Sequence, residues 1–122
     1  MRKIFTLVAA ALLSAGALSA AEPLFSETFE TAEDFGRWLE VDANEDGSKW
    51  QFNPDGDPSH VYYQYNSKNA ANDWLISPAI NISEAGSYMV SYEVYGSSYK
   101  EAIEVWYGSA QSVAAMTAMG KS

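Results

Sequence analysis

Apolar and polar residues alternate along several short stretches of the chain, a spacing typical of β-strands with one buried face. The clearest stretch is Tyr88–Tyr95, in which every second residue from Tyr88 onward is a tyrosine or a valine. Ile103–Tyr107 repeats the alternation, so we expect the two stretches to pair as an antiparallel hairpin across residues 96–101. The predicted strands are Leu24–Phe29, Trp38–Val41, Trp50–Phe52, Val61–Tyr65, Trp74–Ile76, Tyr88–Tyr95 and Ala102–Tyr107.

Two short stretches predict helices. Thr31 can cap a turn over Ala32–Phe35, and Ser112 can cap a helix that runs to Met119. Glycine, proline and aspartate residues separate the predicted strands at short intervals. Many short strands with few helices indicate an all-β fold, either a sandwich or a barrel, and not alternating β and α units.

The N-terminus has the composition of a secretory signal peptide. Met1–Lys3 is basic, Ile4–Leu13 is apolar and Ser14–Ala21 is rich in small residues. The apolar run is shorter than the ~20 residues that a membrane-spanning helix needs. We therefore expect cleavage after Ala21, a single mature domain over residues 22–122, and a location outside the cell or on its surface.

Charge and composition narrow the class of partner. The chain has 16 acidic and seven basic residues and no cysteine, and removal of residues 1–21 deletes two basic residues and no acid. The resulting net charge near −11 argues against nucleic acid and anionic membranes as partners. A domain of this size without disulfides needs another source of stability, and a structural metal ion is one.

One acidic segment has the spacing of a calcium loop. Asp42, Asn44 and Asp46 alternate and are followed by Gly47, the opening of the D-x-[DN]-x-[DN]-G pattern. Position 12 of that pattern is Asn53 where an EF-hand requires glutamate, and no helices flank the loop, so an EF-hand is excluded. The sequence leaves two interpretations, a solvated Asx turn or a calcium site. Further oxygens for a calcium ion could come from Glu27, Glu30, Asp55 or Asp57, of which we select Glu30.

Aromatic residues form the second candidate functional site, one for ligand binding. Sugar-binding modules stack sugar rings on exposed aromatic side chains and hydrogen-bond the hydroxyls through amide and carboxylate groups. Both ingredients occur at residues 61–66, and residues 95–99 add two tyrosines beside serine hydroxyls. Strand propensity and core packing explain many tyrosines equally well. The candidate ligand-binding residues are Tyr63, Tyr65, Tyr95 and Tyr99.

Several segments, in order, resemble the cleaved-adhesin domain, which is related to MAM-like and choice-of-anchor J domains of secreted bacterial proteins. They are Phe25–Glu30, Trp38, the Asp42–Gly47 loop, Trp50, Asn72–Ile80, Tyr88–Tyr95 and Tyr99–Gly108. Asn44 and Glu45 depart from the Asp and Gly usual in that family. The resemblance implies a jelly-roll-like antiparallel β-sandwich, calcium at the acidic loop, and adhesion to proteins or glycans without catalysis. It also implies further strands, so residues 22–122 look like the first two thirds of such a domain.

No catalytic constellation competes with this interpretation. A Ser–His–Asp triad would need His60, which lies in a loop without a nucleophile elbow nearby. The expected function is a secreted, non-catalytic adhesion or carbohydrate-binding module stabilised by calcium, with neutral glycans or host extracellular proteins as partners. The alternatives are an accessory domain of a secreted peptidase or glycoside hydrolase, and a purely structural spacer.

Overall fold

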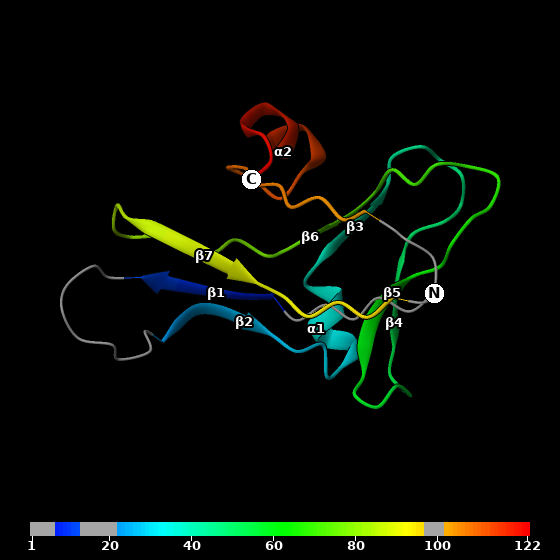
Figure 1. The fold of residues 1–122 in the computed structure, drawn as a ribbon, viewed down its shortest axis with the longest axis horizontal. Helices are drawn as coiled ribbons and strands as arrows, with labels where there is room; N and C mark the ends of the chain where they lie inside the picture. Colours follow the sequence, from blue (N-terminus) through cyan, green and yellow to red (C-terminus); the bar gives the residue numbers. More distant parts are fainter. Residues whose placement is uncertain (1–6, 13–21, 97–101) are drawn as a thin grey trace.

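The fold is β-rich, with small antiparallel sheets and two short helices (Figure 1). The computed structural model describes residues 7–12, 22–96 and 102–122. Its strands are β1 (Leu7–Leu12), β2 (Pro23–Glu27), β3 (Leu39–Asp42), β4 (Trp50–Asn53), β5 (His60–Tyr63), β6 (Asp73–Ile76) and β7 (Ser87–Ser91). Its helices are α1 (Ala32–Gly36) and α2 (Val113–Met119).

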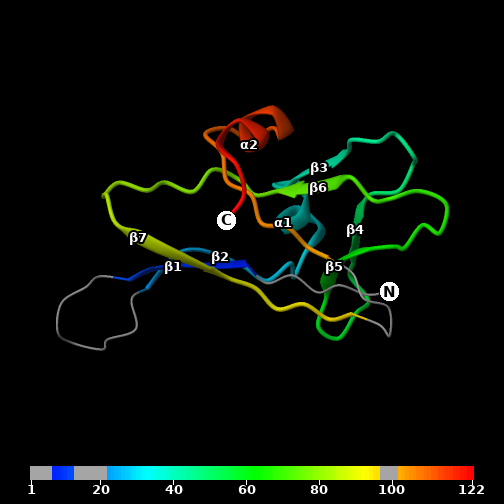
Figure 2. The same ribbon diagram turned by 45° about the horizontal axis from the view of Figure 1, so that its top comes forward.

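The strands form one three-stranded and two two-stranded antiparallel sheets. The orders are β2-β1-β7, β3-β6 and β4-β5. In both ribbon views the three-stranded sheet and the β4–β5 pair lie at opposite ends of the molecule, with α1 between them (Figures 1 and 2). The β3–β6 register places Asp42 opposite Asp73, and the β4–β5 register places Trp50 opposite Tyr63. These two pairings position the site described below.

Six of the predicted strands overlap β2–β7, although β7 ends at Ser91 and not at Tyr95, and the predicted hairpin at the C-terminal side is not formed by the described residues. Within residues 102–107 the described backbone has a single bridge, between Trp106 and Lys121. Two backbone hydrogen bonds flank this bridge. Tyr107 N donates to Gly120 O, and Ser122 N donates to Val105 O. Helix α2 returns the chain to this segment, so two of its backbone groups bond to residues 120 and 122, and β7 pairs with β1 instead.

Both helices begin at the predicted caps. The Thr31 hydroxyl accepts from Asp34 N at 3.1 Å while the Asp34 carboxylate accepts from Thr31 N at 3.0 Å, a complete capping box. The Ser112 hydroxyl accepts from Ala115 N at 3.2 Å. These two helices of the described residues have five and seven residues, and neither qualifies as a membrane-spanning segment.

The buried core is small and organised around aromatic rings. Phe29 and Val61 are fully buried, and Ile76, Trp50 and Tyr63 are nearly so. The Phe29 ring packs on Trp38 with their centroids 5.0 Å apart. Phe29 has a φ of 53°, a conformation that non-glycine residues adopt only when their surroundings impose it.

A buried carboxylate, that of Glu27, imposes this conformation. Its Oε1 accepts from the backbone N–H groups of Thr28 and Phe29, both at 3.0 Å. Its Oε2 accepts from Arg37 Nη2 at 2.9 Å and from Trp38 Nε1 at 3.4 Å. Glu27 therefore joins the end of β2 to the residues that follow α1.

We predict that Glu27→Ala lowers the free energy of unfolding by about 2–3 kcal/mol. The main cost is the loss of the acceptor for two backbone N–H groups, one of them buried, because Arg37 is exposed and can be hydrated instead. Urea denaturation measures the change. Glu33→Ala, at an exposed position in α1, is the matched control and should shift stability by less than about 0.5 kcal/mol. Equal effects of the two substitutions would contradict the role assigned to Glu27.

Candidate metal centre

The acidic loop between β3 and β4 is closed by its first aspartate. Asp42 Oδ1 accepts from Asp46 N at 3.1 Å, and Asp42 Oδ2 accepts from Gly47 N at 2.8 Å. Glu45 and Gly47 have φ values of 55° and 82°, so the chain reverses through two left-handed residues. Glycine at 47 meets this requirement at no steric cost, as the sequence pattern predicts. An Asx turn is present at Asp46, whose Oδ1 accepts from the backbone N–H of Ser48 two residues on, and each Asp42 oxygen keeps a further lone pair.

The turn brings two aspartates against a third from a distant part of the chain. One carboxylate oxygen from each of Asp42, Asp46 and Asp73 lies within 4.8 Å of the other two. Asp73 reaches this position because β6 pairs with β3 and places it directly opposite Asp42. A further bond, from Ala43 N to Asn72 O at 3.0 Å, continues the contact into the loop. We call Asp42, Asp46 and Asp73 the acidic centre.

Asp73 is the most informative member of the acidic centre. Both of its carboxylate oxygens are buried, and neither forms a hydrogen bond of acceptable geometry among the described residues. Burial raises the pKa of Asp73 most, and the charges of Asp42 and Asp46 raise it further, whereas the nearby Tyr63 hydroxyl opposes the rise. A buried carboxylate that accepts no hydrogen bond is costly, and like charges within 4.8 Å of one another repel by a few kcal/mol at the effective dielectric of a protein surface.

The Tyr63 ring forms one wall beside this carboxylate. Its hydroxyl is buried and, within the described residues, has no hydrogen bond of acceptable geometry. The pKa of Tyr63 is raised, chiefly by burial and also by Asp73 beside it. The ring packs on Trp50 at 5.7 Å between centroids, and Trp50 Nε1 donates to Asp73 O at 3.3 Å. The β4–β5 pair thus screens the acidic centre from solvent on this side.

Asp46 is held by neutral donors on its outer side. Its Oδ1 accepts from Ser48 N at 2.8 Å, and its Oδ2 accepts from Asn66 Nδ2 at 3.1 Å. The Ser48 N–H lowers the pKa of Asp46 most, so this residue is an anion at neutral pH. Among the described residues, no lysine or arginine forms an ion pair with any of the three aspartates. Within the part of the chain that the structure describes, hydrogen bonds to Asp42 and Asp46 are what offset the concentrated negative charge.

The structure brings together only part of the metal-ligand set predicted from sequence. Asp42 and Asp46 lie in the acidic centre, and Asn44 lies beside Asp46 with its Nδ2 bonded to Ala70 O at 2.9 Å. Glu30 is not in the acidic centre, and its Oε1 accepts from Thr28 Oγ1 at 3.2 Å. The sequence reasoning missed Asp73. The signal was present at the start of the predicted strand Trp74–Ile76, but it required knowing that this strand pairs with residues 39–42.

The four candidate tyrosines have different environments. Tyr63 is 7% exposed and cannot offer its ring face to a sugar. Tyr65 and Tyr95 are 52% and 61% exposed. Tyr99 lies outside the described residues. Tyr65 is therefore an exposed candidate, and it lies in the loop that directly follows β5.

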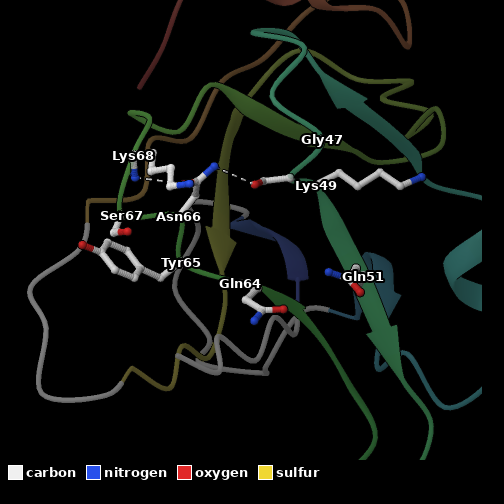
Figure 3. A pocket seen from close by; sticks show the side chains of 9 residues that line it. Gly47, Lys49, Gln51, Gln64, Tyr65, Asn66, Ser67 and Lys68 are labelled. Carbon is white, nitrogen blue, oxygen red and sulfur yellow. Dashed lines mark hydrogen bonds between the residues drawn. The ribbon is translucent and has the colours of Figure 1, made fainter.

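An open pocket of about 290 Å³ lies next to the acidic centre (Figure 3). Tyr65, Gln51, Gln64 and Asn66 line it, together with Lys49 and Lys68. The Lys49 side chain extends away from Tyr65 and pairs with Glu40 at 2.6 Å. Asn66 lines the pocket and also contacts the acidic centre, because its Nδ2 donates to Asp46 Oδ2. The same Nδ2 donates to Ser48 Oγ at 3.2 Å. The pocket and the acidic centre therefore share the Asp46–Ser48–Asn66 contacts.

Comparison with protein-family models, with curated proteins and with solved structures found no match for this chain. Function is therefore inferred from the local geometry and from the chemistry of its residues.

The raised pKa of Asp73 determines how the stability of the folded state changes with pH. A carboxyl group with a raised pKa in the folded state holds its proton there at a pH where the unfolded chain has released it. Its contribution thus favours folding in acid and is lost as the pH rises through the folded-state pKa. A lowered pKa, as at Asp34, has the opposite effect.

We predict that, in buffer freed of divalent cations, Asp73→Asn gains stability relative to the wild type between pH 4 and pH 7. The amide cannot ionise, so the variant avoids the unfavourable buried charge. Urea denaturation at the two pH values measures the difference. Asp34→Asn is the control and should change in the opposite direction, because it removes a carboxylate that the Thr31 cap stabilises. A pH-independent difference for Asp73→Asn would contradict the assignment.

Proposed function

We propose that this protein is an exported, non-catalytic, jelly-roll-like β-sandwich module that binds calcium at the acidic centre and carbohydrate at the adjacent pocket. The observation that carries the proposal is the buried, unpartnered carboxylate of Asp73 facing Asp42 and Asp46. The ordered resemblance to the cleaved-adhesin domain supports the sandwich architecture, the export and the adhesive role.

Calcium fits the donor set better than other common ions. The acidic centre offers only oxygen atoms, whereas zinc prefers nitrogen and sulfur ligands. Calcium takes six to eight oxygens in adaptable geometry, and magnesium demands a small and regular octahedron. Asp42, Asp46 and Asp73 would hold the ion, with loop carbonyls and water completing its shell. The bound ion supplies the positive charge that the described side chains do not bring to this place.

Carbohydrate fits the lining of the pocket. Gln51 and Gln64 offer amide groups to sugar hydroxyls, and the exposed face of Tyr65 offers an apolar platform to the C–H side of a ring. The strongly acidic mature chain disfavours sulfated and sialylated glycans, since like charges repel during encounter. Neutral glycans are the favoured ligands, and host extracellular proteins are the second candidate because a basic protein would be attracted by the same charge.

Calcium should order this pocket as well as the loop. Asp46 contacts Ser48 and Asn66, and both of these residues line the pocket. An ion bound to Asp46 would fix that carboxylate and, through it, the Asn66 side chain. Carbohydrate affinity is therefore linked to calcium in this proposal.

We predict that calcium stabilises the protein by about 2.7 kcal/mol at 100 times its dissociation constant, the value expected for an ion that binds only the folded state. Thermal unfolding with chelator and with calcium measures the effect. Asp73→Asn and Asp46→Ala should abolish most of it. Glu30→Gln is the decisive control, because it tests a ligand that the sequence suggests and the structure places elsewhere. A full calcium response in Asp73→Asn, or its loss in Glu30→Gln, would refute the acidic centre as the binding site.

We predict that a glycan array finds neutral ligands, and that Tyr65→Ala weakens their binding about tenfold through lost stacking. Tyr65→Phe should retain affinity, and Tyr95→Ala should be neutral because Tyr95 does not line the pocket. Chelator should weaken binding to the wild type. An array without neutral hits, together with salt-sensitive binding to a basic protein, would favour the protein partner instead. Binding to neither would leave the module as a structural spacer or an accessory domain of a secreted peptidase or hydrolase.

A further inference from the structure

The three-stranded sheet depends on its middle strand. β1 lies between β2 and β7 and runs antiparallel to both (Figures 1 and 2). Ala9, for example, is opposite Phe25 on one side and Val90 on the other. β2 and β7 do not pair with each other, so within the described residues β1 is their hydrogen-bonded connection.

This middle strand comes from the segment that the sequence predicts to be removed. β1 covers Leu7–Leu12, which belongs to the apolar run of the predicted signal peptide. Cleavage after Ala21 would take β1 away and leave the facing edges of β2 and β7 without partners. The inference below rests on the export included in the proposed function, but not on calcium or carbohydrate binding.

The two flanking strands differ in what else holds them. β2 is anchored without β1, because Glu27 at its end bonds to Arg37 and Trp38, and the Phe25 ring packs on Trp38 at 6.0 Å. β7 has less side-chain burial among the described residues, because four of its five residues are exposed and the fifth is half-buried. Met89 and Val90 are adjacent, point to opposite faces of a strand, and are 49% and 45% exposed even with β1 in place. β7 therefore depends on a strand in the position of β1.

We propose that the mature protein contains a strand-acceptor site between β2 and β7, which binds an extended, uncharged, aliphatic segment of a partner polypeptide. The segment would have about six residues and would run antiparallel to both edges, as residues 7–12 do. Unpaired N–H and C=O groups on two facing edges are satisfied by an inserted strand, the mode of recognition called β-strand addition. Two strand spacings of about 4.8 Å leave room for one strand only.

The sequence of β1 indicates the chemistry of the occupant. Leu-Val-Ala-Ala-Ala-Leu contains no charge, no proline and no large aromatic residue. A ladder on both sides requires an N–H at each bonded position, so proline is excluded within the inserted strand. Backbone pairing supplies affinity in this mode, and small aliphatic side chains supply compatibility with the sheet.

The test uses the exported protein itself. Mass spectrometry first establishes its N-terminus, and hydrogen exchange then follows the amides of residues 87–91 and 23–27. The probe is a synthetic peptide of residues 6–13 with two added lysines for solubility, and the control is the same peptide carrying Ala9→Pro and Ala11→Pro. The uncleaved chain, produced without export, is the reference with β1 in place.

We expect the exported protein to lack residues 7–12 and to exchange its 87–91 amides at least tenfold faster than the uncleaved chain. The peptide should restore slow exchange in 87–91 while leaving β4 and β5 unchanged, and the proline peptide should not. Retention of residues 7–12 after export would overturn the proposal. So would equal protection of 87–91 without peptide, no effect of the peptide, or a self-associated form that the peptide does not dissociate, which would make a second copy the occupant. The calcium response, measured on the same samples, tests the proposed function separately.

Discussion

Backbone pairing holds three mutually repelling carboxylates close together, and the candidate site depends on this constraint. The β3–β6 register sets Asp42 against Asp73, and the Asp42 turn folds Asp46 onto the same place. These constraints come from backbone pairing and from N–H groups, so the backbone positions of the three aspartates cannot separate without breaking a strand pair or a turn. An assembly that concentrates negative charge in this way gains most from a cation.

A comparison of the two buried carboxylates shows why one is structural and the other is a candidate site. Glu27 receives four hydrogen bonds, two from backbone N–H groups and two from side chains. Both oxygens of Asp73 are buried without a hydrogen bond from the described residues, and its pKa is raised. Burial alone does not distinguish the two residues. The difference lies in whether the described residues supply hydrogen-bond donors of acceptable geometry, as they do at Glu27 and do not at Asp73.

The parts of the molecule are connected through short polar contacts rather than through a large core. Asn66 links the pocket to Asp46, and Glu27 links β2 to the residues after α1. The fully buried side chains are few, and β7 is held chiefly by backbone pairing with β1. A protein stabilised in this way has little core packing to replace any one of these contacts.

The sequence predicts helix caps, turns and strands wherever these depend on neighbouring residues. The Thr31 and Ser112 caps, the reversal at Gly47 and six of the strands follow from spacing and propensity, because each depends on backbone groups a few residues apart. Pairing between distant strands was decided only by the tertiary structure. It brought Asp73 to Asp42, left Glu30 elsewhere, buried Tyr63, and gave β7 a partner from residues 7–12 instead of residues 102–107. Strand alternation specifies which residues share a face but not which strand lies alongside, since every edge offers the same N–H and C=O groups.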